Sequence, residues 1–295
     1  MAVRELIDTH QHLWVRSERT YSWIEPAHGP LYDDFTLERL APEIPSSGVT
    51  GAVLVQAADT YEDTFYMLDV AEHTDFVQGV VGWVPFDRPI EARAALDTFS
   101  NNKYFKGVRN LSHDYSNPKY AADDAWITRP EVLATLGHVE KCGLSFDYIS
   151  LKPEHTHNVA ILAGKFPRLR IVVDHFAKPP IAARVMEPWA AAMAEIAQFP
   201  NVYAKLSGLN TASDLANWTV ADWQPYVDFM VRTYGARRVM MGSDWPVIVL
   251  GNSYREVWKA QLEVISGFSG EDQEWMRHKT AKAFYKLRAV AVPVL

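Results

Sequence analysis

Eight short runs of β-branched, aromatic and other apolar residues recur along this chain of 295 residues, with intervals between them that are long enough for a helix. The runs span 5–10, 51–57, 78–84, 105–111, 144–149, 170–176, 202–208 and 239–245. Strands that alternate with helices are typical of parallel α/β folds. Eight such units in roughly 250 to 300 residues predict a (β/α)8 TIM barrel, with residues 1–295 forming a single domain. An open, doubly wound sheet is the competing fold, but it would more often carry a glycine-rich first turn, and DTHQHLW after the first run has no glycine.

The intervals carry signals of their own for helices. Three have the spacing of a capping box: Thr60 with Asp63, Thr128 with Glu131, and Ser269 with Asp272. Residues 187–199 and 254–265 place apolar side chains at steps of three and four, which predicts amphipathic helices on the outside of the barrel. Gly143 suits the carboxyl end of a helix.

Composition excludes several classes of protein. A formal charge of −7 and the absence of a dense Lys/Arg run argue against a nucleic-acid binder. The single cysteine, Cys142, excludes an internal disulfide framework and fits a reducing compartment. The first residues lack the apolar core of a signal peptide, and no apolar run approaches the roughly 20 residues needed to span a bilayer. We therefore expect a cytoplasmic protein without a membrane partner, acting on a small molecule.

The first run ends in two histidines, His10 and His12, separated by one residue. The pair alone proves little, because a second pair with the same spacing, His155 and His157, lies at the start of a predicted helix. In an extended segment residues two apart face the same side, so His10 and His12 can both point into a barrel. Active sites of such barrels gather at the carboxyl ends of the strands, where this pair lies.

Other polar residues stand at strand ends. Arg109 closes the fourth run, His175 follows the sixth, and Asp244 follows the eighth. Singly, each has a structural explanation, such as a core histidine, a strand-end ion pair or a turn before a proline. Together with the histidine pair they favour an active site. Asp174, next to His175, should point the opposite way and cap the following helix.

Several segments resemble one family closely: DTHQHLW, FKGVRN, VVDHFAKPPI, EPWAAAMAEIAQFPNVYAKLSGL and MMGSDWPV. They are similar to the amidohydrolase-related (amidohydrolase 2) family, and within it to the branch of sugar-lactone hydrolases that includes L-fuconolactonase and L-rhamnonolactonase. The likeness runs over nearly the whole chain. The H-x-H pair and the last aspartate are shared across the wider superfamily, whereas the DHxxKPP and KLSGL segments are characteristic of this branch.

The resemblance implies a barrel that hydrolyses cyclic esters, with His10, His12, His175 and Asp244 as the catalytic set. The chemistry of these residues agrees. Opening a lactone needs a water molecule, a base to take its proton, and donors where the carbonyl oxygen gains charge. Asp244 can be the base, and the imidazoles and Arg109 can stabilise the oxyanion.

The resemblance leaves the metal open. His10, His12, His175 and Asp244 would make a good shell for one divalent ion, zinc above all, with a position left for water. Members with two metals add a bridging lysine or glutamate on strand four and a histidine on strand five, where this chain offers Arg109 and Asp147. That departure argues against two metals. Because similar members include metal-independent enzymes, one zinc ion and no metal are equal alternatives.

Substrate contacts are expected from further residues near the strand ends. Arg109 and Lys205 can donate to hydroxyls or a carboxylate. Additional candidates are Gln56, His113, Trp14 and Trp245, with Ser207, Tyr115 and Trp23 as lesser ones. Core packing is the alternative for any one tryptophan. Whether His155 or Asp147 reaches the site is not decided by the sequence.

The function predicted from these residues is the opening of a sugar-acid lactone to its aldonic acid by water, assisted by Asp244. A hydrolase of another cyclic ester, such as a dicarboxylated lactone, and a metal-dependent decarboxylase are alternatives on the same barrel. A non-catalytic sugar-binding barrel is a third. Such a barrel would not need three histidines and an aspartate together, so the set favours an enzyme. The oligomeric state is not predicted.

Overall fold

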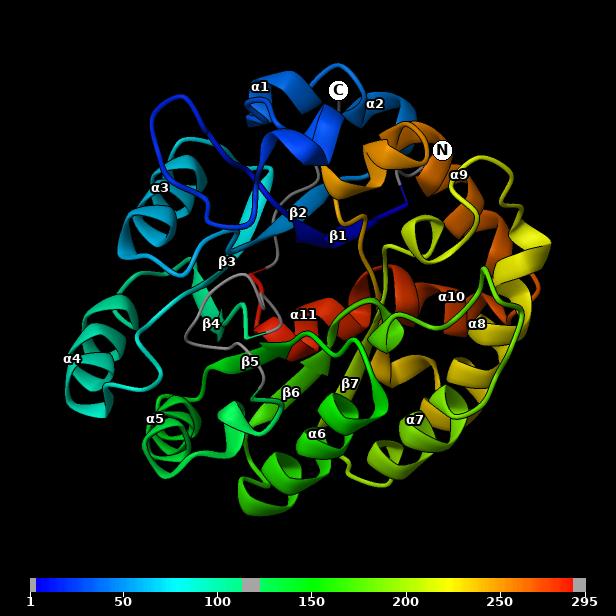
Figure 1. Cartoon of the computed structure of the whole chain (residues 1–295). Helices are drawn as coiled ribbons and strands as arrows, with labels where there is room; N and C mark the ends of the chain where they lie inside the picture. Colours follow the sequence, from blue (N-terminus) through cyan, green and yellow to red (C-terminus); the bar gives the residue numbers. More distant parts are fainter. Residues whose placement is uncertain (1–3, 113–122, 289–295) are drawn as a thin grey trace.

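The computed structural model describes residues 4–112 and 123–288. Eight parallel strands pair in the order β1 to β8 and surround a common centre (Figure 1). They are β1 (Ile7–Gln11), β2 (Gly51–Val55), β3 (Val77–Gly82), β4 (Phe105–Arg109), β5 (Ser145–Tyr148), β6 (Arg170–Val173), β7 (Val202–Leu206) and β8 (Val239–Met241). Gln11 forms a parallel bridge with Trp245, and the His12 amide donates to the Trp245 carbonyl over 2.7 Å. The barrel is therefore joined between its first and last strands, which confirms the predicted TIM barrel and excludes the open sheet.

Helices follow the strands and surround the barrel (Figure 1). They are α1 (Leu37–Leu40), α2 (Ile44–Ser47), α3 (Tyr61–Glu72), α4 (Pro89–Phe99), α5 (Pro130–Lys141), α6 (Pro153–Lys165), α7 (Trp189–Ala197), α8 (Val220–Tyr234), α9 (Tyr254–Val264), α10 (Gly270–Glu274) and α11 (Thr280–Tyr285), with a π-helical turn at Trp275–Lys279. The helices predicted at 187–199 and 254–265 are confirmed as α7 and α9. Within the described residues, no helix has the length and apolar character to cross a membrane.

Two of the three predicted caps are confirmed. The hydroxyls of Thr60 and Ser269 accept from the amides three residues on, at the starts of α3 and α10. The Thr128 prediction is wrong, because Thr128 ends a short 3-10 turn and its hydroxyl donates to the Ala125 carbonyl. The reason is Pro130, which begins α5 and holds Arg129 before it in an extended conformation.

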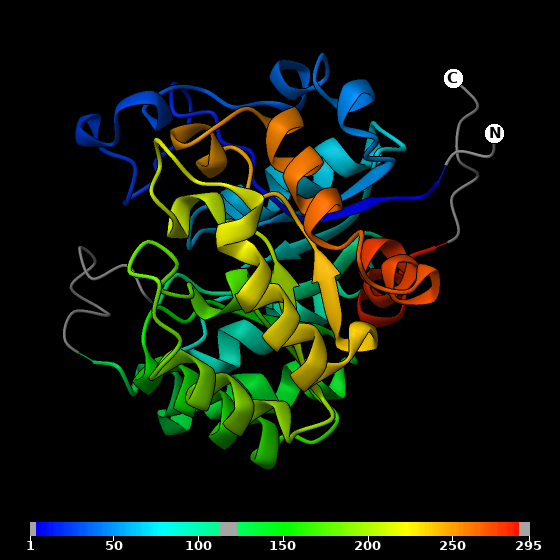
Figure 2. The ribbon, with the colours of Figure 1, turned by 90° about the vertical axis from the view of Figure 1, so that its right-hand side faces the viewer.

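The end of the barrel from which the strands start is covered by α10 and α11. Figures 1 and 2 show this pair crossing that end. Fully buried side chains from five strands pack with Phe284 and Tyr285 there: Ile7, Val53, Val55, Val81, Val172 and Met240. Since this end is filled, the polar residues at the opposite ends of the strands are left to form a site.

The ladder of two strands ends earlier than the sequence runs suggested. β6 stops at Val173, and His175, the next residue but one, has a φ of 53°. β8 stops at Met241, and Asp244 has a φ of 72°. Left-handed residues cannot continue a strand, and such strained conformations cluster at functional sites. The chain thus leaves the sheet where His175 and Asp244 lie.

Candidate active site

The structure brings together the four residues His10, His12, His175 and Asp244. The Nε2 atoms of His10 and His12 lie 3.1 Å apart. Asp244 Oδ1 is 3.4 Å from His12 Nε2 and 3.7 Å from the Nε2 atoms of both His10 and His175. All four side chains are buried. Three imidazoles therefore face one carboxylate oxygen.

Hydrogen bonds determine the form of the imidazoles. His12 Nδ1 lies 2.8 Å from the Val55 carbonyl oxygen, which can only accept, so Nδ1 carries a proton and Nε2 is the nitrogen that faces the other site residues. Burial lowers the pKa of His10 and His175 well below 6.5, and the charges of Lys205 and Lys178 respectively lower it further. His10 and His175 are therefore neutral at pH 7.

Lys205, on β7, has an acceptor for each of its three ammonium protons. Its Nζ lies 2.5 Å from Asp147 Oδ2, 3.0 Å from His10 Nδ1 and 3.2 Å from Asp174 Oδ1. The side chain is fully buried. The sequence prediction made Lys205 a substrate ligand, but its donors are engaged within the protein. Lys205 instead orients His10, and through it Asp147 is connected to the site.

Asp174 corrects a second prediction, since it faces the centre of the site instead of capping a helix. Its Oδ2 lies 3.0 Å from Arg109 Nε, and its Oδ1 lies 3.2 Å from His10 Nδ1. Alternation along β6 places Asp174 on the same side as the inward-facing Val172. His175 reaches the site only because its left-handed backbone turns it inward. Burial would raise the pKa of Asp174, but the charges of Lys205 and Arg109 hold it below its usual value.

Arg109, at the end of β4, is held from two sides. Besides its contact with Asp174, its Nη1 donates to the Gln56 carbonyl over 3.2 Å and lies 3.5 Å from Gln56 Oε1. Gln56 in turn donates to Asp59 Oδ1 over 2.8 Å. Gln56 is fully buried, so its visible role is to position the guanidinium.

Lys178 is a site residue that the sequence reasoning did not single out. Its Nζ lies 3.8 Å from Asp244 Oδ2 and donates to Thr211 Oγ1 over 3.2 Å. With 24 % of its side chain exposed, it is the most accessible of the charged groups around Asp244. It lines a cavity of about 190 Å³ with Leu151 and Trp189. Burial lowers the pKa of its ammonium group. The sequence signal that could have identified Lys178 is its position as a cation three residues after His175, which lies at a strand end.

Asp8 is a second residue that the sequence reasoning missed. One carboxylate oxygen accepts from the amides of Ser243 and His10 over 2.7 and 3.1 Å, and the other accepts from the Ser243 hydroxyl over 2.6 Å. Burial raises the pKa of Asp8 to about 6, against the effect of these hydrogen bonds. Asp8 thereby ties β1 to the loop that carries Asp244. A charged residue inside an apolar strand was the signal.

Gly208, after β7, allows the close approach of two site residues. Its φ is 59°, and a Cβ atom there would lie 2.9 Å from Asp244 Oδ2 and 3.1 Å from His175 Nδ1. Ser207, its neighbour, lies with its Oγ 2.8 Å from the same His175 nitrogen. Any larger residue at Gly208 would displace the carboxylate or the imidazole.

The tryptophans pack in the protein. The buried ring of Trp14 lies edge-on to Trp23 and Phe35, and its indole nitrogen donates to the Asp33 carbonyl. Trp245 packs edge-on against the same Phe35, with ring centroids 5.5 Å apart. This is the core packing that was the alternative to stacking on a sugar.

The remaining candidates lie apart from the cluster or outside the described residues. His155 and His157 both lie on α6. His155 Nε2 is 3.2 Å from Asp124 Oδ1, and His157 Nδ1 is 2.9 Å from Glu195 Oε1. His113 and Tyr115 fall in the segment 113–122, which lies outside the described residues.

The donor set fits one divalent metal ion. Zinc binds nitrogen at about 2.0 to 2.1 Å, so its tetrahedral ligand atoms lie about 3.3 Å apart. The four contacts among His10, His12, His175 and Asp244 Oδ1 measure 3.1 to 3.7 Å. The group whose ligand atoms all lie within 4.8 Å of one another is His10, His175 and Asp244; His12 is not part of that group, although its Nε2 contacts His10 and Asp244. For His10 to offer Nε2 to an ion, its proton would sit on Nδ1, where Asp174 Oδ1, 3.2 Å away, would accept it in place of the donation from Lys205 to Nδ1.

Comparisons with known proteins place this site in context. A family model described as amidohydrolase matches residues 7–287. The chain is 38% identical over 259 residues to an L-fucono-1,5-lactonase of Burkholderia ambifaria, covering 87% of this chain and 86% of the relative. It is 27% identical to an L-fucono-1,5-lactonase of Burkholderia multivorans, covering 85% of each. A crystal structure of an amidohydrolase from Burkholderia multivorans with bound zinc superposes with a TM-score of 0.85 at 26% identity, covering 96% of this chain and 99% of that one.

Proposed function

Because the chain belongs to the amidohydrolase family, we propose that it is a lactonase that opens a sugar-acid lactone, L-fucono-1,5-lactone or a close relative, to the aldonic acid. The family predicted from the sequence motifs is confirmed by the match over residues 7–287. The observation that supports the activity best is the carboxylate of Asp244, which has one oxygen toward three imidazoles and the other toward Lys178.

In the proposed reaction Asp244 acts as the base. Its Oδ2 takes a proton from a water molecule while the water oxygen bonds to the lactone carbonyl carbon, and the carbonyl electron pair moves onto its oxygen. When the carbonyl re-forms, the bond to the ring oxygen breaks. The ring oxygen takes the proton from Asp244, which leaves a hydroxyl, an acid and the regenerated base.

The neighbouring residues stabilise the charge that develops. Hydrogen-bond donors that already point toward the carbonyl oxygen lower the energy of the transition state, because they need no reorganisation during the reaction. The ammonium group of Lys178 lies 3.8 Å from Asp244 Oδ2 and can donate to a ring or hydroxyl oxygen. We further propose that His10, His12, His175 and Asp244 Oδ1 hold one zinc ion, which would polarise the carbonyl.

The charges near the site favour a lactone without additional carboxylates. Arg109 is engaged by Asp174, and Lys205 by Asp147 and Asp174. Among the residues that the structure describes, Lys178 is then the accessible cation beside Asp244. The chain as a whole carries a charge of −7, so it has no general attraction for a polyanion. A dicarboxylated lactone would therefore need more than one free cation in the site itself.

The test is a panel of aldonolactones followed with a pH indicator, since each turnover releases one acid. We expect kcat/KM to differ about tenfold or more between epimers, because a buried donor left unpaired by the wrong epimer costs about 1 to 3 kcal/mol. A preference for a dicarboxylated pyrone lactone would refute the substrate. Carbon dioxide release from an aromatic acid, without lactone turnover, would indicate a decarboxylase, and binding without any turnover would indicate a sugar-binding barrel.

A further inference from the structure

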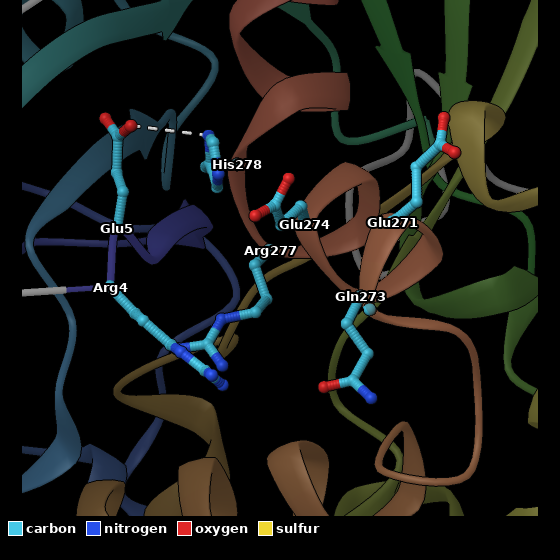
Figure 3. Close-up of a pocket in the computed structure, with 8 residues that line it drawn as sticks. Arg4, Glu5, Glu271, Gln273, Glu274, Arg277 and His278 are labelled. Atoms are coloured by element: carbon cyan, nitrogen blue, oxygen red, sulfur yellow. Dashed lines mark ion pairs between the residues drawn. The ribbon is translucent and has the colours of Figure 1, made fainter.

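A second polar cavity lies at the end of the barrel opposite the candidate active site. It has a volume of about 330 Å³ and lies between the residues that precede β1 and the segment formed by α10 and the π-helical turn (Figure 3). Nothing in the proposed reaction uses this cavity. Its charged lining includes Arg4, Glu5, Glu271, Glu274 and Arg277.

Each of the three glutamates in this cavity has a cationic partner. Glu5 Oε2 lies 2.6 Å from Lys282 Nζ, Glu271 Oε1 lies 3.1 Å from Arg237 Nη2, and Glu274 Oε2 lies 2.5 Å from Lys279 Nζ. His278 also contacts Glu5, over 3.3 Å. The acids are therefore already neutralised by neighbouring groups.

The two arginines differ from the acids. Their side chains extend toward the same region of the cavity in Figure 3. Within the described part of the chain, neither Arg4 nor Arg277 has an acidic partner within ion-pair distance or a side-chain hydrogen bond, and Arg277 Nε is buried without an acceptor. Burial and the nearby charge of Arg4 lower the pKa of Arg277. Two like charges thus face one cavity without an ion-pair partner among the described residues, although the charge of Arg4 also acts on Glu274.

We propose that this cavity binds a small oxyanion of charge about −2, of the phosphate type, between Arg4 and Arg277. Three paired cations balance the three glutamates, so the two arginines leave an excess of two positive charges. Guanidinium groups present paired N–H donors that match the oxygens of a phosphate group. Free phosphate and the phosphate group of a phosphorylated metabolite share this chemistry.

The test measures binding directly, by calorimetric titration of the whole protein with inorganic phosphate at constant ionic strength. Glycerol phosphate in a parallel titration distinguishes the two sources, because tighter binding of the ester would indicate contacts beyond the phosphate group. We expect Arg4→Gln and Arg277→Gln each to weaken binding about tenfold or more, since each removes charged hydrogen bonds. Arg168→Gln is the matched control, because Arg168 is an exposed arginine paired with Glu140 elsewhere on the surface.

The active site also contains cations that phosphate can contact, so the variants decide which site is measured. Equal binding by the wild type, Arg4→Gln and Arg277→Gln would overturn the proposal, as would no binding at millimolar phosphate. An equal loss in Arg168→Gln would do the same. Arg4 is exposed, so its variant tests the site even if Arg277→Gln fails to fold. Lactone turnover should stay within about twofold of the wild type in both arginine variants.

Discussion

The hydroxyl of Tyr285 donates to Asp147 Oδ2 over 2.6 Å inside the barrel. The same oxygen accepts from Lys205, which also contacts His10 Nδ1. A helix that closes one end of the barrel is therefore connected through three buried contacts to an imidazole of the candidate site at the other end.

Tyr285→Phe should disturb that connection without opening a cavity. A hydrogen bond to a charged group contributes about 1.5 to 3 kcal/mol, so we expect a loss of about that size in the free energy of unfolding. We also expect kcat to fall while KM changes little. Tyr234→Phe is the control, because its buried hydroxyl donates to the Met193 carbonyl, away from the site. Urea unfolding and steady-state kinetics measure both effects, and equal kcat values in the two variants would contradict the connection.

Asp244→Asn keeps the shape of the side chain and removes the base. We expect the lactonase rate to fall by about 10² to 10⁴, the usual contribution of a general base. Circular dichroism and the unfolding midpoint serve to check that the fold is intact. A folded variant with most of the wild-type rate would remove Asp244 from the proposed mechanism.

Lys178→Met tests the cation beside Asp244. The variant preserves much of the length of the side chain and loses its charge, so we expect kcat/KM to fall about tenfold or more, as for the loss of a charged hydrogen bond. Lys152→Met is the matched control, since Lys152 lines the same cavity but pairs with Asp124. Similar kinetics for the two variants would argue against a special role for Lys178.

Metal analysis of the purified protein tests the zinc proposal. We expect about one equivalent of zinc, lost in His10→Ala and His12→Ala and retained in His155→Ala, whose imidazole faces Asp124. Chelation should lower turnover, and added zinc should restore it. Full turnover in protein verified as metal-free would mean that the imidazoles act as hydrogen-bond donors instead.

Stability should depend on pH through Asp63, a buried residue of α3. Its Oδ2 accepts from the amides of Ala57 and Ala58, but burial raises its pKa to about 7. Between the unfolded pKa near 4 and this value the folded state binds the extra proton, so stability falls as pH rises and levels off above about 7.

Urea unfolding from pH 5 to pH 8 measures this dependence in the wild type and in Asp63→Asn. The Asp63 contribution is on the order of 4 kcal/mol over the whole range between the two pKa values. The variant should show a flatter profile than the wild type. Identical profiles would mean that another group accounts for the slope.

The sequence by itself determined the barrel and predicted that His10, His12, His175 and Asp244 lie together, although it missed Lys178 and misplaced Asp174. Eight apolar runs separated by intervals of helix length are a local pattern. Such a pattern can be recognised in the sequence without knowing how the rest of the chain is arranged. The placement of His10 and His12 on one side follows from the same alternation, and their Nε2 atoms do meet. Arg109, His175 and Asp244 were found because strand ends converge in this fold.

Tertiary structure decided what those residues touch. Lys205 was expected to bind substrate, but closing the barrel brings it against acceptors from β1, β5 and the end of β6, which engage all three of its protons. Asp174 and His175 were assigned opposite directions by alternation, yet the left-handed turn after Val173 lets both face the site. Such contacts join residues far apart in the sequence, and their geometry depends on backbone angles that no spacing rule contains. The physical reason is that periodicity reports which side of a strand a residue occupies, whereas partners and protonation depend on the other strands.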